Sequence, residues 1–136
     1  MKNPRHDFHG TEFDWFAHDL EGFVAVMSSA GSGRFPALLA PMGPEIDAVL
    51  EAMGIHYRSP ASSRAPGLGF YAYDTDMNGG PYRRTGAPQR PRRLEDLTGK
   101  LRDFAECVAI DGRFRELTAV GPTQFRYLGW SEANGE

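Results

Sequence analysis

Five arginines lie in one short segment in the middle of the chain. Residues 82–93 contain Arg83, Arg84, Arg90, Arg92 and Arg93 and no acidic residue. The rest of the chain holds the other 10 basic residues against all 18 acidic ones, which leaves it at a net charge of −8. A guanidinium group is a planar fork of donors that suits a phosphate or a carboxylate. Either the segment binds an anion, or its arginines cover apolar surface and pair with acids elsewhere.

A second stretch has the spacing that opens a calcium-binding loop. In Asp74-Thr75-Asp76-Met77-Asn78-Gly79, oxygen-bearing side chains recur at every second position, and a glycine follows where such a loop turns sharply. The pattern fails at its twelfth position, where Thr85 stands in place of a bidentate glutamate. A polar turn between two strands is the preferred interpretation.

The other reactive side chains do not form a known catalytic or metal-binding pattern. The four histidines are not accompanied by a cysteine pair that could complete a zinc site. Gly31-Ser32-Gly33 lacks the rest of a nucleophile or phosphate-loop motif, and Cys107 adjoins apolar residues as a buried cysteine does. The sequence therefore predicts no catalytic residue, no metal and no cofactor, and it favours a binding protein over an enzyme.

Composition bounds the class of protein. The chain has 136 residues, 40% of them hydrophobic, and a net charge of −3, so we expect one folded domain and no nucleic-acid partner. The one cysteine cannot form an internal disulfide, and no apolar run approaches the length of a membrane helix or forms a secretory signal. These features predict a cytoplasmic protein without a membrane segment.

Periodic patterns predict the elements of the first two thirds of the chain. Apolar residues alternate along 13–18 and 23–28, on either side of a short polar stretch, which indicates a β-hairpin. Apolar residues at helical spacing over 44–53, followed by Gly54, indicate a helix. A second hairpin is expected from a strand over 68–73, through Asn78-Gly79, to a strand over 82–85.

The last third permits two interpretations. Leu94, Leu97, Leu101 and Phe104 have the spacing of a helix face. This helix could end before a strand over 106–110, which would form a hairpin with 113–120 through Asp111-Gly112. Alternatively, it continues from Leu94 to about Ile110. A final strand is predicted within 124–130.

Together the patterns predict a single α+β domain over residues 1–136. We expect a mostly antiparallel sheet of about five or six strands, with two helices packed on one face. Residues 1–11 and 131–136 are polar and are predicted to be loosely ordered ends.

Several short motifs resemble a group of small uncharacterised bacterial proteins. Residues 14–22, Asp-Trp-Phe-Ala-His-Asp-Leu-Glu-Gly, are similar to the D-W-F-A-x-D-x-x-G hairpin with which those proteins begin. The strand over 69–74, the Tyr82-Arg83-Arg84 return and the stretch 87–97 are also similar. Such proteins resemble immunity proteins of bacterial toxin systems, single α+β domains that bind and block a toxin. The resemblance implies a protein partner, and the acidic balance would suit a basic one.

The expected partner surface combines aromatic and acidic side chains of the two hairpins. If exposed, Trp15, Tyr71 and Tyr73 would anchor the partner, and Asp14, Asp19, Asp74 and Asp76 would supply negative charge. The alternative function is a small enzyme or ligand-binding domain for an anionic metabolite, held by Arg83, Arg84, Arg90, Arg92 and Arg93. Unpaired sheet edges leave a homodimer open.

Overall fold

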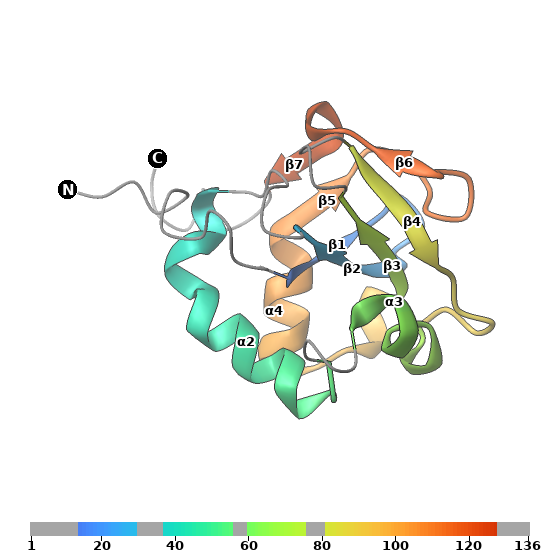
Figure 1. The fold of residues 1–136 in the computed structure, drawn as a ribbon. Helices are drawn as coiled ribbons and strands as arrows, with labels where there is room; N and C mark the ends of the chain where they lie inside the picture. Colours follow the sequence, from blue (N-terminus) through green and yellow to red (C-terminus); the bar gives the residue numbers. More distant parts are fainter. Residues whose placement is uncertain (1–13, 30–36, 56–59, 76–80, 128–136) are drawn as a thin grey trace.

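One seven-stranded sheet organises the chain. A computed structural model describes residues 14–29, 37–55, 60–75 and 81–127, and the sheet within them has the order β6-β4-β3-β2-β1-β5-β7 (Figure 1). Its strands are β1 (Asp14–His18), β2 (Val24–Ser28), β3 (Tyr71–Asp74), β4 (Tyr82–Gly86), β5 (Val108–Ile110), β6 (Ala119–Val120) and β7 (Phe125–Tyr127). The α-helices are α2 (Gly43–Ala52), α3 (Ala61–Arg64) and α4 (Gly99–Cys107), and short 3₁₀ turns are η1 (Ala37–Met42), η2 (Pro66–Leu68), η3 (Leu94–Asp96) and η4 (Pro122–Gln124).

The α+β class is confirmed, but the predicted sheet has too few strands, and its strands do not pair mostly antiparallel. The sheet is mixed, because β2 pairs in parallel with β3 and β1 pairs in parallel with β5. Two parallel neighbours need a crossover between them. The segment that carries α2 and α3 provides one crossover from β2 to β3, and three α-helices are present instead of the two expected.

Both predicted hairpins of the first two thirds are present. β1 and β2 pair antiparallel, and so do β3 and β4, with Asp74 opposite Arg83. The predicted turn at 78–79 lies outside the described residues. The helix expected over 44–53 is α2, and Gly54 follows it with a φ of 81°, the left-handed conformation that ends helices.

In the last third of the chain, the structure agrees in part with the interpretation of a helix followed by a strand. The continuous helix over 94–110 is wrong, because α4 ends at Cys107 and the chain continues as β5. The hairpin between 106–110 and 113–120 is also wrong: β5 pairs with β1 and β7, whereas β6 pairs with β4 at the other side of the sheet. The final strand is confirmed as β7.

The two edge strands of the sheet are consecutive in the chain. Only residues 121–124 separate β6 from β7, although five strands lie between them in the sheet. So short a connection requires the sheet to curl until its edges approach one another, as Figure 1 shows. The curl brings β4 and β7 to Trp15, whose ring meets those of Tyr82 and Phe125 edge to face, with centroids 5.7 and 5.3 Å away.

The two faces of β1 pack against different parts of the molecule. His18 donates from Nδ1 to the carbonyl of Ala105 over 2.7 Å, so its face of the strand, which also carries Phe16, lies under α4. Trp15 and Ala17 face the other way, toward the inside of the curl. Helix α2 packs beside α4 on β1, and α3 lies against β2, β3 and β4. None of the helices described here is long and apolar enough to cross a membrane.

The hydroxyl of Tyr73 ties the sheet to the segment after β5. It donates to the carbonyl of Leu117 at 2.6 Å, and burial raises the pKa of Tyr73 above its ordinary value of 10.0. Replacing Tyr73 with phenylalanine should lower the free energy of unfolding at pH 7 by about 1–2 kcal/mol, because the bond is lost.

The same substitution should also change the stability at alkaline pH. Since the unfolded chain releases the Tyr73 proton at a lower pH than the folded chain, this group removes stability as the pH rises above 10.0. The loss is at most about 1.4 kcal/mol per pH unit. Urea denaturation from pH 8 to 11 should show a shallower decline for Tyr73→Phe than for the wild type. Burial also raises the pKa of Tyr71, which is present in both proteins. Parallel declines would contradict the assignment.

Candidate functional site: the surface around Leu20

The aromatic residues expected to anchor a partner are not on the surface. Trp15 and Tyr73 have no exposed area, and Tyr71 is 5% exposed. Their rings pack inside the curled sheet, where those of Tyr71 and Tyr73 meet the ring of Phe114. The prediction of an aromatic docking surface is therefore wrong. Alternation along a strand indicates that two faces differ, but a sheet that curls and is covered on both sides buries both.

The acidic residues of the expected surface lie in different places. Asp14 and Asp74 flank Ser28 in one row across β1, β2 and β3, and both are half-buried. Adjacent residues of such a row point to the same face. Asp76 lies outside the described residues. Asp19 is only 3% exposed, so it cannot present its charge to a partner, and that part of the prediction is wrong.

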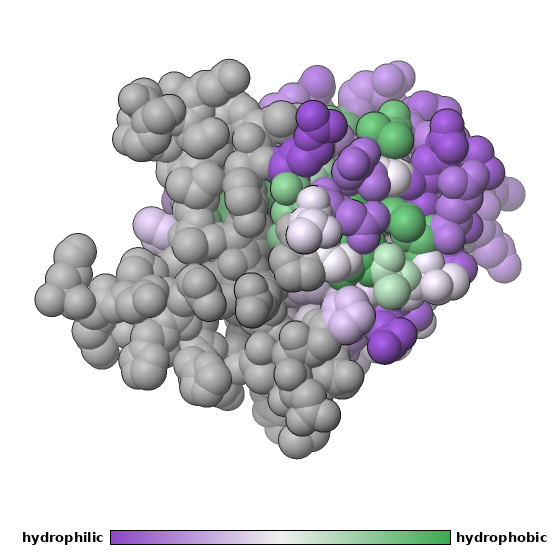
Figure 2. Space-filling view, turned by 90° about the horizontal axis from the view of Figure 1, so that it is seen from above, coloured by the Kyte–Doolittle hydropathy of each residue, from purple (hydrophilic) through white to green (hydrophobic). Residues whose placement is uncertain are grey.

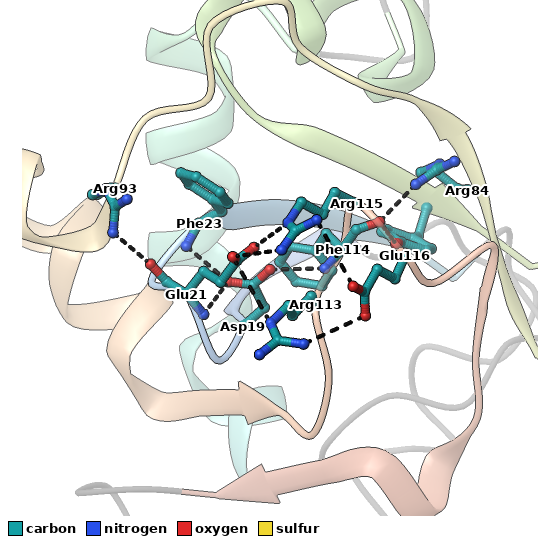
Figure 3. A network of polar contacts seen from close by, with 10 residues as sticks. Asp19, Glu21, Phe23, Arg84, Arg93, Arg113, Phe114, Arg115 and Glu116 are labelled. Carbon is teal, nitrogen blue, oxygen red and sulfur yellow. Dashed lines mark hydrogen bonds and ion pairs between the residues drawn. The ribbon is translucent and has the colours of Figure 1, made fainter.

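Asp19 instead organises two loops from inside. Its Oδ1 accepts hydrogen bonds from the backbone N–H groups of Glu21 and Phe23, at 3.0 and 2.9 Å. Its Oδ2 accepts from the N–H of Phe114, 95 residues away in the chain, at 2.7 Å (Figure 3). Burial raises the pKa of the Asp19 carboxyl, although the three N–H groups favour the charged form. One carboxylate thus fixes the β1–β2 turn against the segment after β5.

The fixed turn presents Leu20 to solvent. This side chain is 62% exposed and is the one large hydrophobic side chain that the described residues leave exposed. Its backbone N–H donates to the carbonyl of Gly112 over 3.0 Å, which adds a second link between the turn and the segment after β5. A leucine on an anchored turn loses little conformational freedom when a partner covers it.

Charged side chains surround the turn. The carboxylate of Glu21 accepts both arms of the Arg115 fork, at 2.9 and 3.1 Å, and lies 3.8 Å from Nε of Arg113. Glu116 lies within 3.8 Å of the same two arginines. Arg93 donates to the carbonyl of Glu21 at 2.9 Å, with its guanidinium over the ring of Phe23. Figure 3 shows these glutamates and arginines. Together with Leu20 we call them the Leu20 surface: Leu20, Glu21, Arg93, Arg113, Arg115 and Glu116.

The side chains of the arginine segment, residues 82–93, lie in different places. Arg93 joins the Leu20 surface, and Arg84 donates to the carbonyl of Phe114 at 2.6 Å. Arg92 lies over the ring of Phe70, and Arg83 is exposed on the other face of β4. The five guanidinium groups therefore do not converge on one anion. Figure 2 shows hydrophilic side chains gathered on the β4 and β6 side of the described surface.

One residue of the Leu20 surface stands out in the sequence. Leu20 is an apolar residue in a turn of otherwise polar residues, where no strand pattern places it in the core. The contribution of Arg113 and Arg115 had no such signal, because nothing in the sequence shows that residues 111–117 lie beside the β1–β2 turn.

The geometry of this region suits binding. Both oxygens of Asp19 are held by backbone N–H groups, and the carboxylates of Glu21 and Glu116 are engaged by arginines. Among the residues that the structure describes, no three histidine, cysteine or acidic side chains are grouped so that they could hold a metal ion. An exposed apolar side chain, next in the chain to a glutamate that arginines engage, has the mixed composition found at the centre of protein interfaces.

Comparison with known proteins adds no relative. No protein-family model, no curated protein and no solved structure matches the chain.

Two substitutions of Asp19 should show how much its hydrogen bonds contribute to the stability of the fold. An asparagine offers one carbonyl oxygen, so it can serve either the turn or Phe114 but not both, and Asp19→Asn should lower the free energy of unfolding by about 2 kcal/mol. Asp19→Ala removes all three bonds and should cost more. Asp111→Asn, at an exposed position of the same segment, is the matched control and should change little. Chemical denaturation measures all three, and equal stabilities of Asp19→Ala and the control would contradict the role of Asp19.

Proposed function

We propose that this protein is a non-catalytic binding protein that recognises a protein partner through the Leu20 surface. The observation that carries the proposal is the exposure of Leu20 on a turn held by a buried carboxylate. Leaving a large apolar side chain in water forgoes about 1.5–3 kcal/mol that burial would supply. A partner that covers Leu20 would recover part of this free energy.

The charges around Leu20 indicate the chemistry of the partner. Arg93, Arg113 and Arg115 outnumber Glu21 and Glu116 by one charge. Arg113 and Arg115 pair with the two glutamates, whereas Arg93 contacts a carbonyl and a ring. A fitting partner has an apolar depression for the leucine and carboxylates at its rim for the guanidinium groups. We therefore expect the contacting surface of the partner to be acidic, which differs from the basic partner that the overall charge of the chain suggests.

We further propose that the partner is a toxin and that this protein is its immunity protein. The support is the resemblance of the β1–β2 hairpin motif to small bacterial proteins of that kind. An immunity protein needs a rigid complementary surface and no reactive group. The double anchoring of the β1–β2 turn meets the first need.

Site-specific crosslinking tests the surface. A photo-reactive amino acid placed at position 20 should give a discrete adduct in cells of the native host, and the same amino acid at exposed position 48 on α2 should not. Once the adduct partner has been identified and purified, calorimetry should show that Leu20→Ser weakens binding at least tenfold, whereas Ala48→Ser does not. Arg115→Ala should weaken binding and reduce its salt dependence, unlike Arg102→Ala on α4.

The outcomes separate the two levels of the proposal. If Leu20→Ser and Ala48→Ser bind the partner equally, the Leu20 surface is not the interface. If the purified partner is not toxic when expressed alone, the immunity proposal fails while a protein-binding function stands. A toxic partner whose effect is relieved by co-expressed wild type but not by Leu20→Ser would support both.

A further inference from the structure

A pocket with an arginine at its rim lies apart from the Leu20 surface. It has a volume of about 420 Å³ and is lined by Pro66, Gly67, Gly69, Ala87, Gln89 and Arg90. One wall is the η2 turn with Gly69 after it, and the other is the segment after β4, which bends at Gln89 and Arg90. The volume falls in the range of small-molecule sites.

Tight backbone packing fixes the two walls against each other. A Cβ atom on Gly86 would lie 2.7 Å from the Pro66 ring, and one on Gly69 would lie 2.6 Å from the Arg92 side chain, so neither position admits a larger residue without a shift. The N–H of Arg92 also donates to the carbonyl of Gly69 at 2.9 Å. The pocket is therefore built into the fold and does not depend on the positions of long side chains alone.

The charge at this pocket has one sign. Residues 60–73 and 81–93, which supply both walls, contain six arginines and no acid. Arg90 is exposed, and in the part of the chain that the structure describes no carboxylate pairs with it. Arg84, Arg92 and Arg93 are by contrast occupied by a carbonyl or a ring. Of the arginine segment, Arg90 is thus the residue that lines a space able to admit a ligand.

We propose that this pocket binds a small organic anion. Arg90 would hold a carboxylate or phosphate head in its fork, and the Gln89 amide lies next to it in the chain as a further donor. Pro66 and Ala87 offer apolar surface to a compact body, and the missing side chain of Gly67 leaves room for it. This site uses no residue of the Leu20 surface and is independent of the proposed protein-binding function.

Titration of the full ¹⁵N-labelled chain with three probes of one shape tests the site. Benzoate and phenyl phosphate carry the two possible heads, and benzamide is the neutral match for benzoate. At least one anion should produce saturable shifts at the amides of Gly67, Gly69 and Gln89, and benzamide should bind at least tenfold more weakly. The stronger anion identifies the preferred head.

Variants assign the binding to the pocket. Arg90→Ala should weaken the binding of the stronger anion at least tenfold, whereas Arg102→Ala, which removes a half-buried arginine of α4, should not. Gly67 lines the pocket and a Cβ there meets no atom within 4 Å, so Gly67→Phe should leave the chain folded, and a bulky ring beside the pocket should weaken binding. Should Gly67→Phe unfold, the Arg90→Ala result decides alone. Absence of saturable shifts, equal binding of benzamide, or unchanged affinity in Arg90→Ala would overturn the proposal.

Discussion

The carboxylate of Asp19 is the interaction on which the exposed part of the molecule depends. A buried carboxylate is costly unless hydrogen bonds satisfy it, and here three backbone N–H groups do so from two segments distant in sequence. This requirement joins the β1–β2 turn to residues 112–117. It holds Phe114, whose ring covers Tyr71 and Tyr73 inside the sheet, and on the outside it fixes the position of Leu20. Core packing and surface presentation thus share one anchor.

The curl of the sheet explains why the aromatic side chains are interior. Because β6 and β7 form opposite edges and only four residues separate them, the sheet must bend around its own face. That face needs large side chains to fill it, and Trp15, Tyr73, Tyr82 and Phe114 are among the largest buried ones. The indole N–H of Trp15 meets the hydroxyl of Tyr82 at 3.3 Å, and Tyr73 reaches the carbonyl of Leu117, so the polar atoms that tyrosine and tryptophan bring inside have partners.

Local patterns in the sequence predict individual strands and helices but not which strands pair with one another. The alternation over 13–18 and 23–28 and the helical spacing over 44–53 depend on neighbours in the chain, and β1, β2 and α2 appear where these patterns place them. The pairing of β5 with β1 and of β6 with β4 depends on residues about 90 and 40 positions apart, which no local period encodes. The prediction of the site is wrong for the same reason. The sequence indicates an exposed charge at Asp19, because nothing in it shows that the N–H of Phe114 lies beside this carboxylate.

The arginine segment follows one of its interpretations in part. Covering apolar surface is what Arg92 and Arg93 do, since their guanidinium groups lie 5.6 and 5.0 Å from the centres of the Phe70 and Phe23 rings. The expected pairing with acids is replaced at Arg84 and Arg93 by hydrogen bonds to the backbone carbonyls of Phe114 and Glu21. Pro88 and Pro91 flank a bend at Gln89 and Arg90, between β4 and these contacts. At this bend Arg90 lines the pocket, while Arg92 and Arg93 hold the residues that follow in place.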